Sequence, residues 1–285
     1  YSLDKLKELY IWQLSFLVSV FDFERNRIEE AKNKYLPTKE DLDPNTRFID
    51  NSIIKKISEN REFRRKEEIF HISWIENEEL IRSALNSIKD SKLYVTYMNK
   101  KENDFAKDKT FIHKIFAEVI AESNLLMQLY EEKNIFWADD YDNVSYSIIK
   151  TLKAITPDFT YDTPLPMTNK KASEDEANDK AFALELFRKT IINSQEFIPL
   201  IDNKTNNWEV ERIAIVDIIL CRMALTEFTQ FSSIPVKVTM NEYIEISKMY
   251  STPKSSTFIN GLLDKLADEL KNSGKIKKKG RGLVE

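Results

Sequence analysis

Glycine is scarce in this chain, with four among 285 residues. Soluble proteins average about 7 per cent glycine, and tight strand turns and phosphate-cradling loops depend on the positive φ angles that glycine adopts. The sequence also contains no Gly-x-Ser-x-Gly, Walker or dinucleotide-binding fingerprint. These absences argue against a nucleotide-binding α/β fold, and we identify no catalytic residue.

Cysteine is represented once, by Cys221, inside the apolar run 218–225. A lone cysteine forms no intramolecular disulfide, so we interpret it as a buried thiol. The most apolar amino-terminal segment, residues 10–21, is interrupted by polar side chains and is too short to span a bilayer. It also lacks the basic flank and cleavage site of a secretory signal, so we expect a cytoplasmic protein without membrane contact.

The two histidines do not form a convincing metal site. Glu68 and His71 have the spacing of one half of a helical di-iron carboxylate site, which requires a second such motif. Thr110 stands three residues before His113, so the second half is missing. A calcium-loop start at residues 41–45 likewise lacks the required glycine and closing glutamate. We therefore expect neither a metal nor another cofactor.

The net charge of −4 hides an uneven distribution. Residues 271–285 hold six basic side chains against one acidic one, a local charge of +5 that leaves −9 for the other 270 residues. A globally acidic chain can bind phosphates through a local basic patch, because the potential at the contact surface decides the interaction. We expect residues 273–285 to form a basic, flexible tail.

Apolar residues recur at steps of three and four along most of the chain, and 32 per cent of the residues are charged. This pattern is typical of amphipathic helices, so we predict an all-α protein. The predicted helices before residue 156 cover residues 3–34, 47–58, 61–71, 76–88, 91–99, 104–121, 122–132 and 139–155.

Residues 156–175 contain three prolines and many polar residues, which predicts a linker. The spacing of Ser173 and Glu176 is that of a capping box for the helix that follows. We predict two helices within 178–203, separated near Asn193 or Ser194. The predicted organisation is a helical extension over 1–155, the linker, a binding region over 176–272 and the tail.

The stretch 208–264 combines three predicted helices with two short connectors. Pro235 ends the first helix, because proline lacks an N–H group and restricts the preceding residue. Thr239 and Glu242 have capping-box spacing, which predicts that the second helix starts there. The connector 251–255 leads into a third helix with an apolar stripe from Phe258 to Leu270. We expect the first helix to be mostly buried.

This stretch resembles the carboxy-terminal half of the NusB family of all-helical transcription antitermination factors. The matching motifs, in order, are Arg212, Val216-Asp217, Leu220-x-Arg222-x-Ala224, Glu227, Ile234-Pro235-x-Lys237-Val238, Asn241-Glu242, Glu245, Lys248 and Phe258-Ile259-Asn260-Gly261-x-Leu263-Asp264. The segment 43–50 is similar to one in the longer NusB proteins of Bacteroidetes. The family's Arg-rich opening has no counterpart here, so we expect that part of the family's RNA site to be missing.

The resemblance implies two binding sites. The start of the last helix would bind RNA through Lys254, Ser255, Thr257 and Phe258, with the aromatic ring stacking on an unpaired base, and Lys237 of the Pro235 connector would join them. An acidic face around Glu211, Asp217 and Glu227 would bind the basic ribosomal protein NusE. From the residues alone, each acid could equally form a solvated face or pair with a nearby arginine, and the helix start could be a simple cap beside a core phenylalanine.

The function implied by the resemblance is that of a non-enzymatic factor. Together with NusE it would bind boxA-type single-stranded RNA and, through the elongation complex, promote read-through by RNA polymerase, notably in ribosomal RNA operons. One alternative is a NusB-like RNA-binding domain associated with a ribosomal RNA methyltransferase. The other is a helical scaffold that binds only proteins.

Overall fold

The computed structural model describes residues 2–99, 104–166, 170–205 and 213–283, and within these ranges the regular structure is helical, without strands. The all-α prediction is confirmed. The chain divides into two compact units, residues 1–176 and 177–285. In the described ranges, no helix combines the length and apolarity needed to cross a bilayer.

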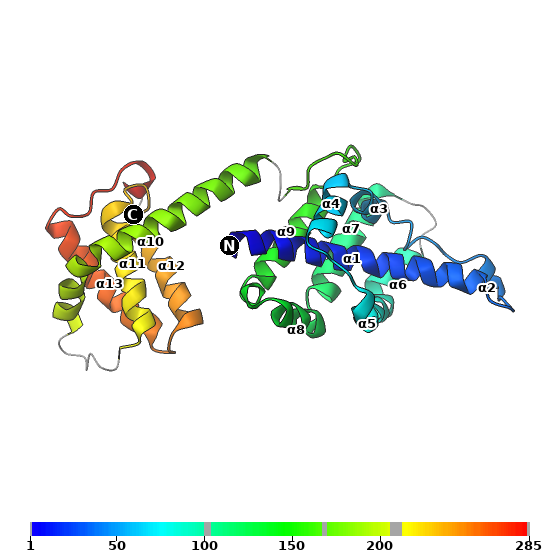
Figure 1. Cartoon of the computed structure of the whole chain (residues 1–285), viewed down its shortest axis with the longest axis horizontal. Helices are drawn as coiled ribbons and strands as arrows, with labels where there is room; N and C mark the ends of the chain where they lie inside the picture. The colour runs from blue at the N-terminus through cyan, green and yellow to red at the C-terminus, as the bar shows by residue number, and fades with distance from the viewer. Residues whose placement is uncertain (1, 100–103, 167–169, 206–212, 284–285) are drawn as a thin grey trace. The chain divides into compact units, whose positions relative to one another are not determined.

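The first unit is a bundle of helices (Figure 1). Its described helices are α1 (Ser2–Lys32), α2 (Lys39–Leu42), α3 (Ser52–Ser58), α4 (Arg61–Ile69), η1 (Ile75–Asn77), α5 (Glu78–Asp90), α6 (Lys92–Met98), α7 (Phe105–Ile115), η2 (Phe116–Ile120), α8 (Asn124–Lys133), η3 (Ile135–Trp137) and α9 (Tyr141–Ala154).

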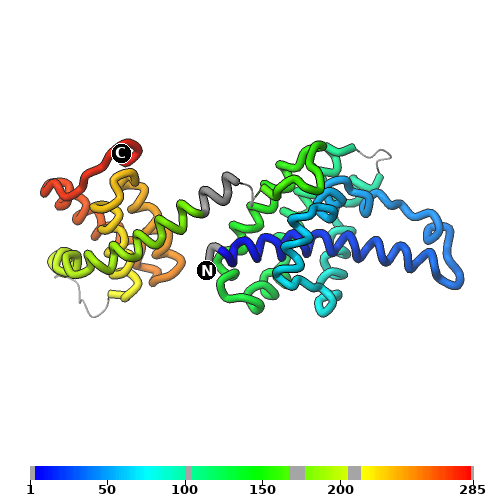
Figure 2. Tube along the Cα trace, turned by 45° about the horizontal axis from the view of Figure 1, so that its top comes forward, coloured from blue at the N-terminus to red at the C-terminus, as the bar shows by residue number. Residues whose placement is uncertain are grey.

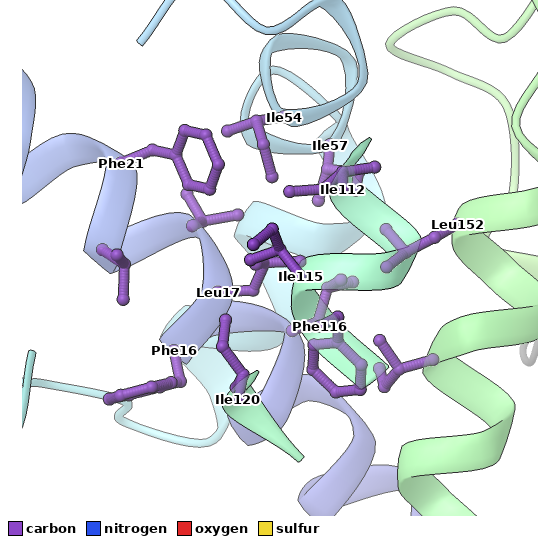
Figure 3. Packing of buried hydrophobic residues seen from close by; sticks show 14 of the residues in the cluster. Phe16, Leu17, Phe21, Ile54, Ile57, Ile112, Ile115, Phe116, Ile120 and Leu152 are labelled. Carbon is purple, nitrogen blue, oxygen red and sulfur yellow. The ribbon is translucent and has the colours of Figure 1, made fainter. Parts of the chain in front are cut away.

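Helix α1 runs through the core of this unit because its middle is apolar on every side, as expected of a helix that is buried all round. Its residues Phe16, Leu17 and Phe21 belong to one buried cluster with side chains from α3, α7 and α9 (Figure 3). Two polar side chains in the run have buried partners. The Gln13 amide oxygen accepts from the Ser145 hydroxyl at 3.1 Å. The Tyr10 hydroxyl similarly shares a 2.8 Å hydrogen bond with Thr151.

The segment after α9 packs onto the rest of the first unit. The prediction of a linker at 156–175 is therefore wrong for the first half of that range. Phe159 and Leu165 are buried in the core. The Asn60 amide donates to the carbonyl of Thr163 at 2.8 Å, and the Leu165 N–H donates to Glu62 at 2.9 Å. This segment is therefore a loop that is held in place by core side chains and by partly buried hydrogen bonds.

The second unit is a smaller bundle. Its described helices are α10 (Lys170–Thr205, which begins before the unit boundary), α11 (Ile215–Gln230), α12 (Val236–Tyr250), α13 (Ser255–Asn272) and η6 (Gly280–Leu283). Its core is made by Phe197, Ile201, Leu220, Cys221, Ala224, Leu225, Phe228, Tyr243, Ile259, Leu262, Leu263, Leu266, Ala267 and Leu270. Eight of the 16 residues of α11 are buried, whereas Ile215 and Ile219 are exposed, so the expectation of a mostly buried helix is met only in part. The predicted burial of the apolar stripe on α13 is confirmed.

Helix α10 is continuous, so the predicted break near Asn193 or Ser194 is wrong. The Asn193 amide donates to the Lys189 carbonyl at 2.7 Å, within the helix, instead of ending it. Pro199 also lies inside α10. Phe197 and Ile201, on either side of the proline, are buried in the core. Their packing stabilises α10 where proline lacks the N–H group of a regular helical hydrogen bond.

Helix α12 begins at Val236 behind Pro235, three residues before the predicted start. Thr239 is not an N-cap but a buried residue within the helix, and its hydroxyl donates to Glu227 at 2.8 Å. The capping-box spacing was misleading because proline, with its fixed φ, already starts the helix. The prediction that Pro235 separates two helices is confirmed.

The C-terminal segment up to Leu283 packs onto the rest of the second unit, which corrects the expectation of a flexible tail for these residues. Gly274 has a φ of +67° and ends α13, with its own N–H bonded to the Lys271 carbonyl at 3.0 Å and the Lys275 N–H bonded to the Leu270 carbonyl at 2.9 Å. The chain, red in Figure 2, then returns to the turn after α11, where the Lys279 N–H donates to the Ser232 carbonyl at 2.9 Å.

Candidate nucleic-acid interface

Asp217, near the start of α11, fixes the turn that leads into α13. Its buried carboxylate accepts hydrogen bonds from the hydroxyls of Ser251, at 2.6 Å, and Ser255, at 2.7 Å. The Ser255 hydroxyl in turn accepts from the Thr252 N–H at 3.1 Å. The connector is therefore a polar network that sets the position from which α13 departs.

A groove of about 680 Å³ opens beside this turn, and we call it the first groove. It is lined by Lys204, Ile213, Ala214, Asp217, Thr252, Pro253, Lys254, Ser255, Thr257, Phe258, Gly261, Leu262 and Lys265. Lys254 is the N-cap of α13 and offers no side-chain hydrogen bond to it. A helix N-terminus without a side-chain cap presents N–H groups and a positive dipole end to an anion.

Three of the residues predicted to bind RNA line this groove with side chains that a ligand could reach. Lys254 and Thr257 are exposed, while Phe258 is half-buried and packs against the core. Ser255 also borders the groove, but its side chain is buried and donates to Asp217. Ser255 therefore positions the helix start, and its hydroxyl is not presented to a ligand.

Sequence reasoning missed two lysines of the first groove. Lys265 is exposed and follows Thr257 and Gly261 at steps of four, so the helical period could have placed it on the same face. Lys204 comes from α10 and forms an ion pair of 2.7 Å with Glu269. No sequence signal pointed to Lys204, because only the packing of α10 brings it to α13.

Lys237 lies in a different place from the other predicted RNA-binding residues. It lines a separate groove of about 580 Å³, which we call the second groove. The lining residues are Val236, Lys237, Lys271, Ile276, Lys277, Lys278, Gly282 and Leu283. The structure therefore divides the predicted RNA-binding residues between two grooves of the same unit.

Two of the three residues predicted for the acidic partner face do not lie on the surface. Asp217 and Glu227 are buried, and Glu211 lies outside the described residues. Glu227 accepts hydrogen bonds from Thr239 and, at 2.6 Å, from the Tyr243 hydroxyl. Both buried carboxylates therefore hold neighbouring helices together. An acid whose oxygens accept internal hydrogen bonds has little exposed surface for a basic partner.

Burial governs the ionisation of the groups around these acids. It raises the pKa of the Tyr243 hydroxyl far above its ordinary value, and the neighbouring Glu227 carboxylate raises that pKa further. Burial, followed by the charge of Asp217, raises the pKa of the Cys221 thiol to about 12. The thiol is thus in the protonated form at neutral pH, as the interpretation of a buried thiol requires.

The Glu68 and His71 pair does not share a helix face, because α4 ends at Ile69 and His71 has a φ of 50°. Among the described residues, no three His, Cys, Asp or Glu side chains are grouped so that they could hold a metal ion.

These observations define the second unit as an all-helical bundle with two lysine-lined grooves, each beside a helix N-terminus that has no side-chain cap. The NusB family model matches residues 145–268, from within α9 to near the end of α13. The chain belongs to the NusB family, since curated members also match it at 40–43 per cent identity.

Three relatives named "Transcription antitermination protein NusB" illustrate the similarity. The protein of Salinibacter ruber is 42 per cent identical over 111 residues, which are 39 per cent of this chain and 69 per cent of that protein. The protein of Chloroherpeton thalassium is 43 per cent identical over 37 per cent of this chain and 50 per cent of its own length. The protein of Geobacter sulfurreducens is 40 per cent identical over 34 per cent of this chain and 71 per cent of its own length. No solved structure shows significant similarity to this chain.

Proposed function

We propose that the protein is a transcription antitermination factor that binds boxA-type single-stranded RNA together with NusE, and so promotes read-through by RNA polymerase, notably in ribosomal RNA operons. Such a factor acts in the cytoplasm and needs no cofactor. The general role is supported by the family and by the names of the relatives. The RNA site is supported by one observation above all, the combination of groups in the first groove.

The first groove offers three kinds of contact that single-stranded RNA uses. The uncapped start of α13 suits a phosphate. Lys254 and Lys265 add positive charges that can neutralise phosphates, and the release of the RNA's counterions then favours binding. The half-buried ring of Phe258 is held by the core, so one part of it can stack on an unpaired base. The phosphate contacts would supply affinity, while the stacked and hydrogen-bonded bases would supply sequence preference.

The proposed partner site is on the second unit near α11, and the sequence offers Glu211, which lies outside the described residues, as its acidic contact. Asp217 and Glu227 contribute to it indirectly, by holding α11 against α12 and α13. A basic ribosomal protein would be attracted by acids on the surface of these helices. The RNA and protein sites are then distinct, and substitutions should affect them separately.

The test compares the affinity of boxA-type RNA with that of a scrambled RNA, for the chain with and without NusE. Lys254→Glu should weaken boxA binding about tenfold while sparing NusE, since it reverses one phosphate-contacting charge. Lys248→Glu is the matched control, because Lys248 is exposed and lies outside both grooves, paired with Glu245. Equal binding of the two RNAs at moderate salt would refute the proposal, and equal loss of RNA and NusE would refute the separation of sites.

A further inference from the structure

The second groove is a basic surface that the first groove does not explain. Its lining includes four lysines and, among the described residues, no acid. Lys237, Lys271 and Lys277 are exposed, whereas Lys278 is partly buried. The lysines come from three separate places in the chain, the start of α12, the end of α13 and the C-terminal segment. Three of these lysines belong to the basic run 271–285, and the fold brings Lys237 from the start of α12 to the same groove.

Lys278 anchors the C-terminal segment to the end of α11. Its ammonium group donates to the backbone carbonyls of Glu227, at 3.0 Å, and Phe231, at 2.9 Å. A cation is stabilised at this position because the last carbonyls of a helix lack intrahelical donors and carry the negative end of the dipole. Burial lowers the pKa of Lys278, yet these contacts give its charge an internal partner. Lys278 thus acts as a clamp.

Gly282 provides the second attachment. A Cβ atom at this position would lie 2.0 Å from the Ser232 carbonyl oxygen, so the segment approaches the α11–α12 turn more closely than any other residue would allow. Ile276, between the end of α13 and Lys278, packs against the core of the unit. The segment is therefore held along its length, and Lys277 is kept at the groove beside Lys237.

The start of α12 adds a further group for an anion. Its N-cap is Pro235, which provides no side-chain hydrogen bond to the first turn. The first N–H groups of α12 thus lie uncapped at the edge of a groove that Val236 and Lys237 line. A positive helix end and several lysines at one groove are the features that phosphate groups require, while the lack of an acid in the lining disfavours a basic partner.

We propose that the second groove is a phosphate-binding surface for single-stranded RNA, which extends the RNA contact beyond the first groove. This inference rests on the proposed function, because that function brings RNA to the same unit. The grooves use opposite ends of α13, and the helical rise separates Thr257 from Lys271 by about 21 Å. A short RNA would occupy the first groove, and a longer one would reach both. The second groove reads charge and not sequence.

The experiment uses the full chain, a short RNA with only the boxA-type sequence, and the same RNA extended by about 16 nucleotides, the upper range of a single-strand site. The double variant Lys237→Glu/Lys277→Glu should bind the extended RNA about tenfold more weakly and the short RNA nearly as well as wild type. The logarithm of the affinity for the extended RNA falls linearly with the logarithm of the salt concentration, and each phosphate contact adds about 0.7 to the steepness of this fall. Loss of two contacts should therefore make the slope less steep by at least about 1.4.

Lys279→Glu is the matched control, because Lys279 is an exposed lysine of the same segment that does not line the groove. The single variant Lys277→Glu should clearly exceed it in effect on the extended RNA, and the circular dichroism of each variant confirms its fold. Loss of affinity equal to that of the control would overturn the inference while leaving the proposed function standing. Failure of the wild type to bind either RNA would sink both. If poly-glutamate bound as tightly as the extended RNA, and if the double variant weakened both interactions equally, the assignment of the second groove to RNA would be overturned.

Discussion

The hydroxyl of Tyr243 on α12 donates a 2.6 Å hydrogen bond to the carboxylate of Glu227 on α11, and both residues are buried. The carboxylate has a second donor in Thr239, one turn earlier on α12. The pair connects the two helices that flank the Pro235 turn. A buried carboxylate depends on such donors, because its desolvation costs far more than that of a neutral group.

Tyr243→Phe should therefore destabilise the second unit by about 2 kcal/mol, since the buried Glu227 carboxylate loses one of its two hydroxyl donors. Chemical denaturation followed by circular dichroism measures the change. Tyr35→Phe is the control, because Tyr35 is 97 per cent exposed and its substitution should cost close to nothing. A loss as small as that of the control would show that the hydrogen bond has no net effect on stability.

Alkaline pH should unfold the second unit through the same tyrosine. Its folded pKa is raised above the ordinary value of 10.0. The stabilising effect is therefore complete below pH 10 and is lost as pH rises above it, because the unfolded tyrosine releases its proton first. Urea denaturation at a series of pH values from 8 to 11 should show the fall. Tyr243→Phe should flatten the part that belongs to this residue, and an unchanged slope in the variant would contradict the assignment.

Much of the helical framework follows from local sequence. The predicted helix at 3–34 corresponds to α1, and that at 139–155 corresponds to α9, within a few residues. Local periodicity suffices here because amphipathic stripes determine which face a helix buries. The errors arise where tertiary packing overrides a local signal. Thr239 has the spacing of a cap but is buried against Glu227, and α10 continues through Asn193.

The candidate site was predictable only in part. Lys254, Thr257 and Phe258 are near neighbours in sequence, so their shared groove follows from one helix start. Lys237 was grouped with them but lines the second groove, because its place depends on how α12 packs against α13. The buried position of Asp217 could not be read from the sequence either. An acid near a helix N-terminus is equally compatible with an exposed and a buried environment.

Ser255→Ala should lower stability and weaken RNA binding together. The substitution removes a donor to the buried Asp217 carboxylate, at a cost of about 1–3 kcal/mol, and loosens the start of α13. Ser256→Ala is the matched control, because the neighbouring Ser256 is only partly buried and does not line the first groove. Thermal unfolding and RNA titration of both variants provide the comparison. Weaker RNA binding by Ser255→Ala at unchanged stability would instead indicate direct contact between its hydroxyl and RNA.

Gly282→Ala should release the C-terminal segment from the α11–α12 turn. The added methyl group would lie 2.0 Å from the Ser232 carbonyl oxygen and 3.2 Å from the Lys278 Cβ atom, so the backbone must move. Gly261→Ala is the matched control, since a Cβ atom there meets nothing within 4 Å and helical alanine is favoured over glycine by about 1 kcal/mol. Limited trypsin digestion should cut Gly282→Ala faster than wild type after residues 275–279, and Gly261→Ala no faster. Equal rates for all three proteins would show that the segment is held without the close approach at Gly282.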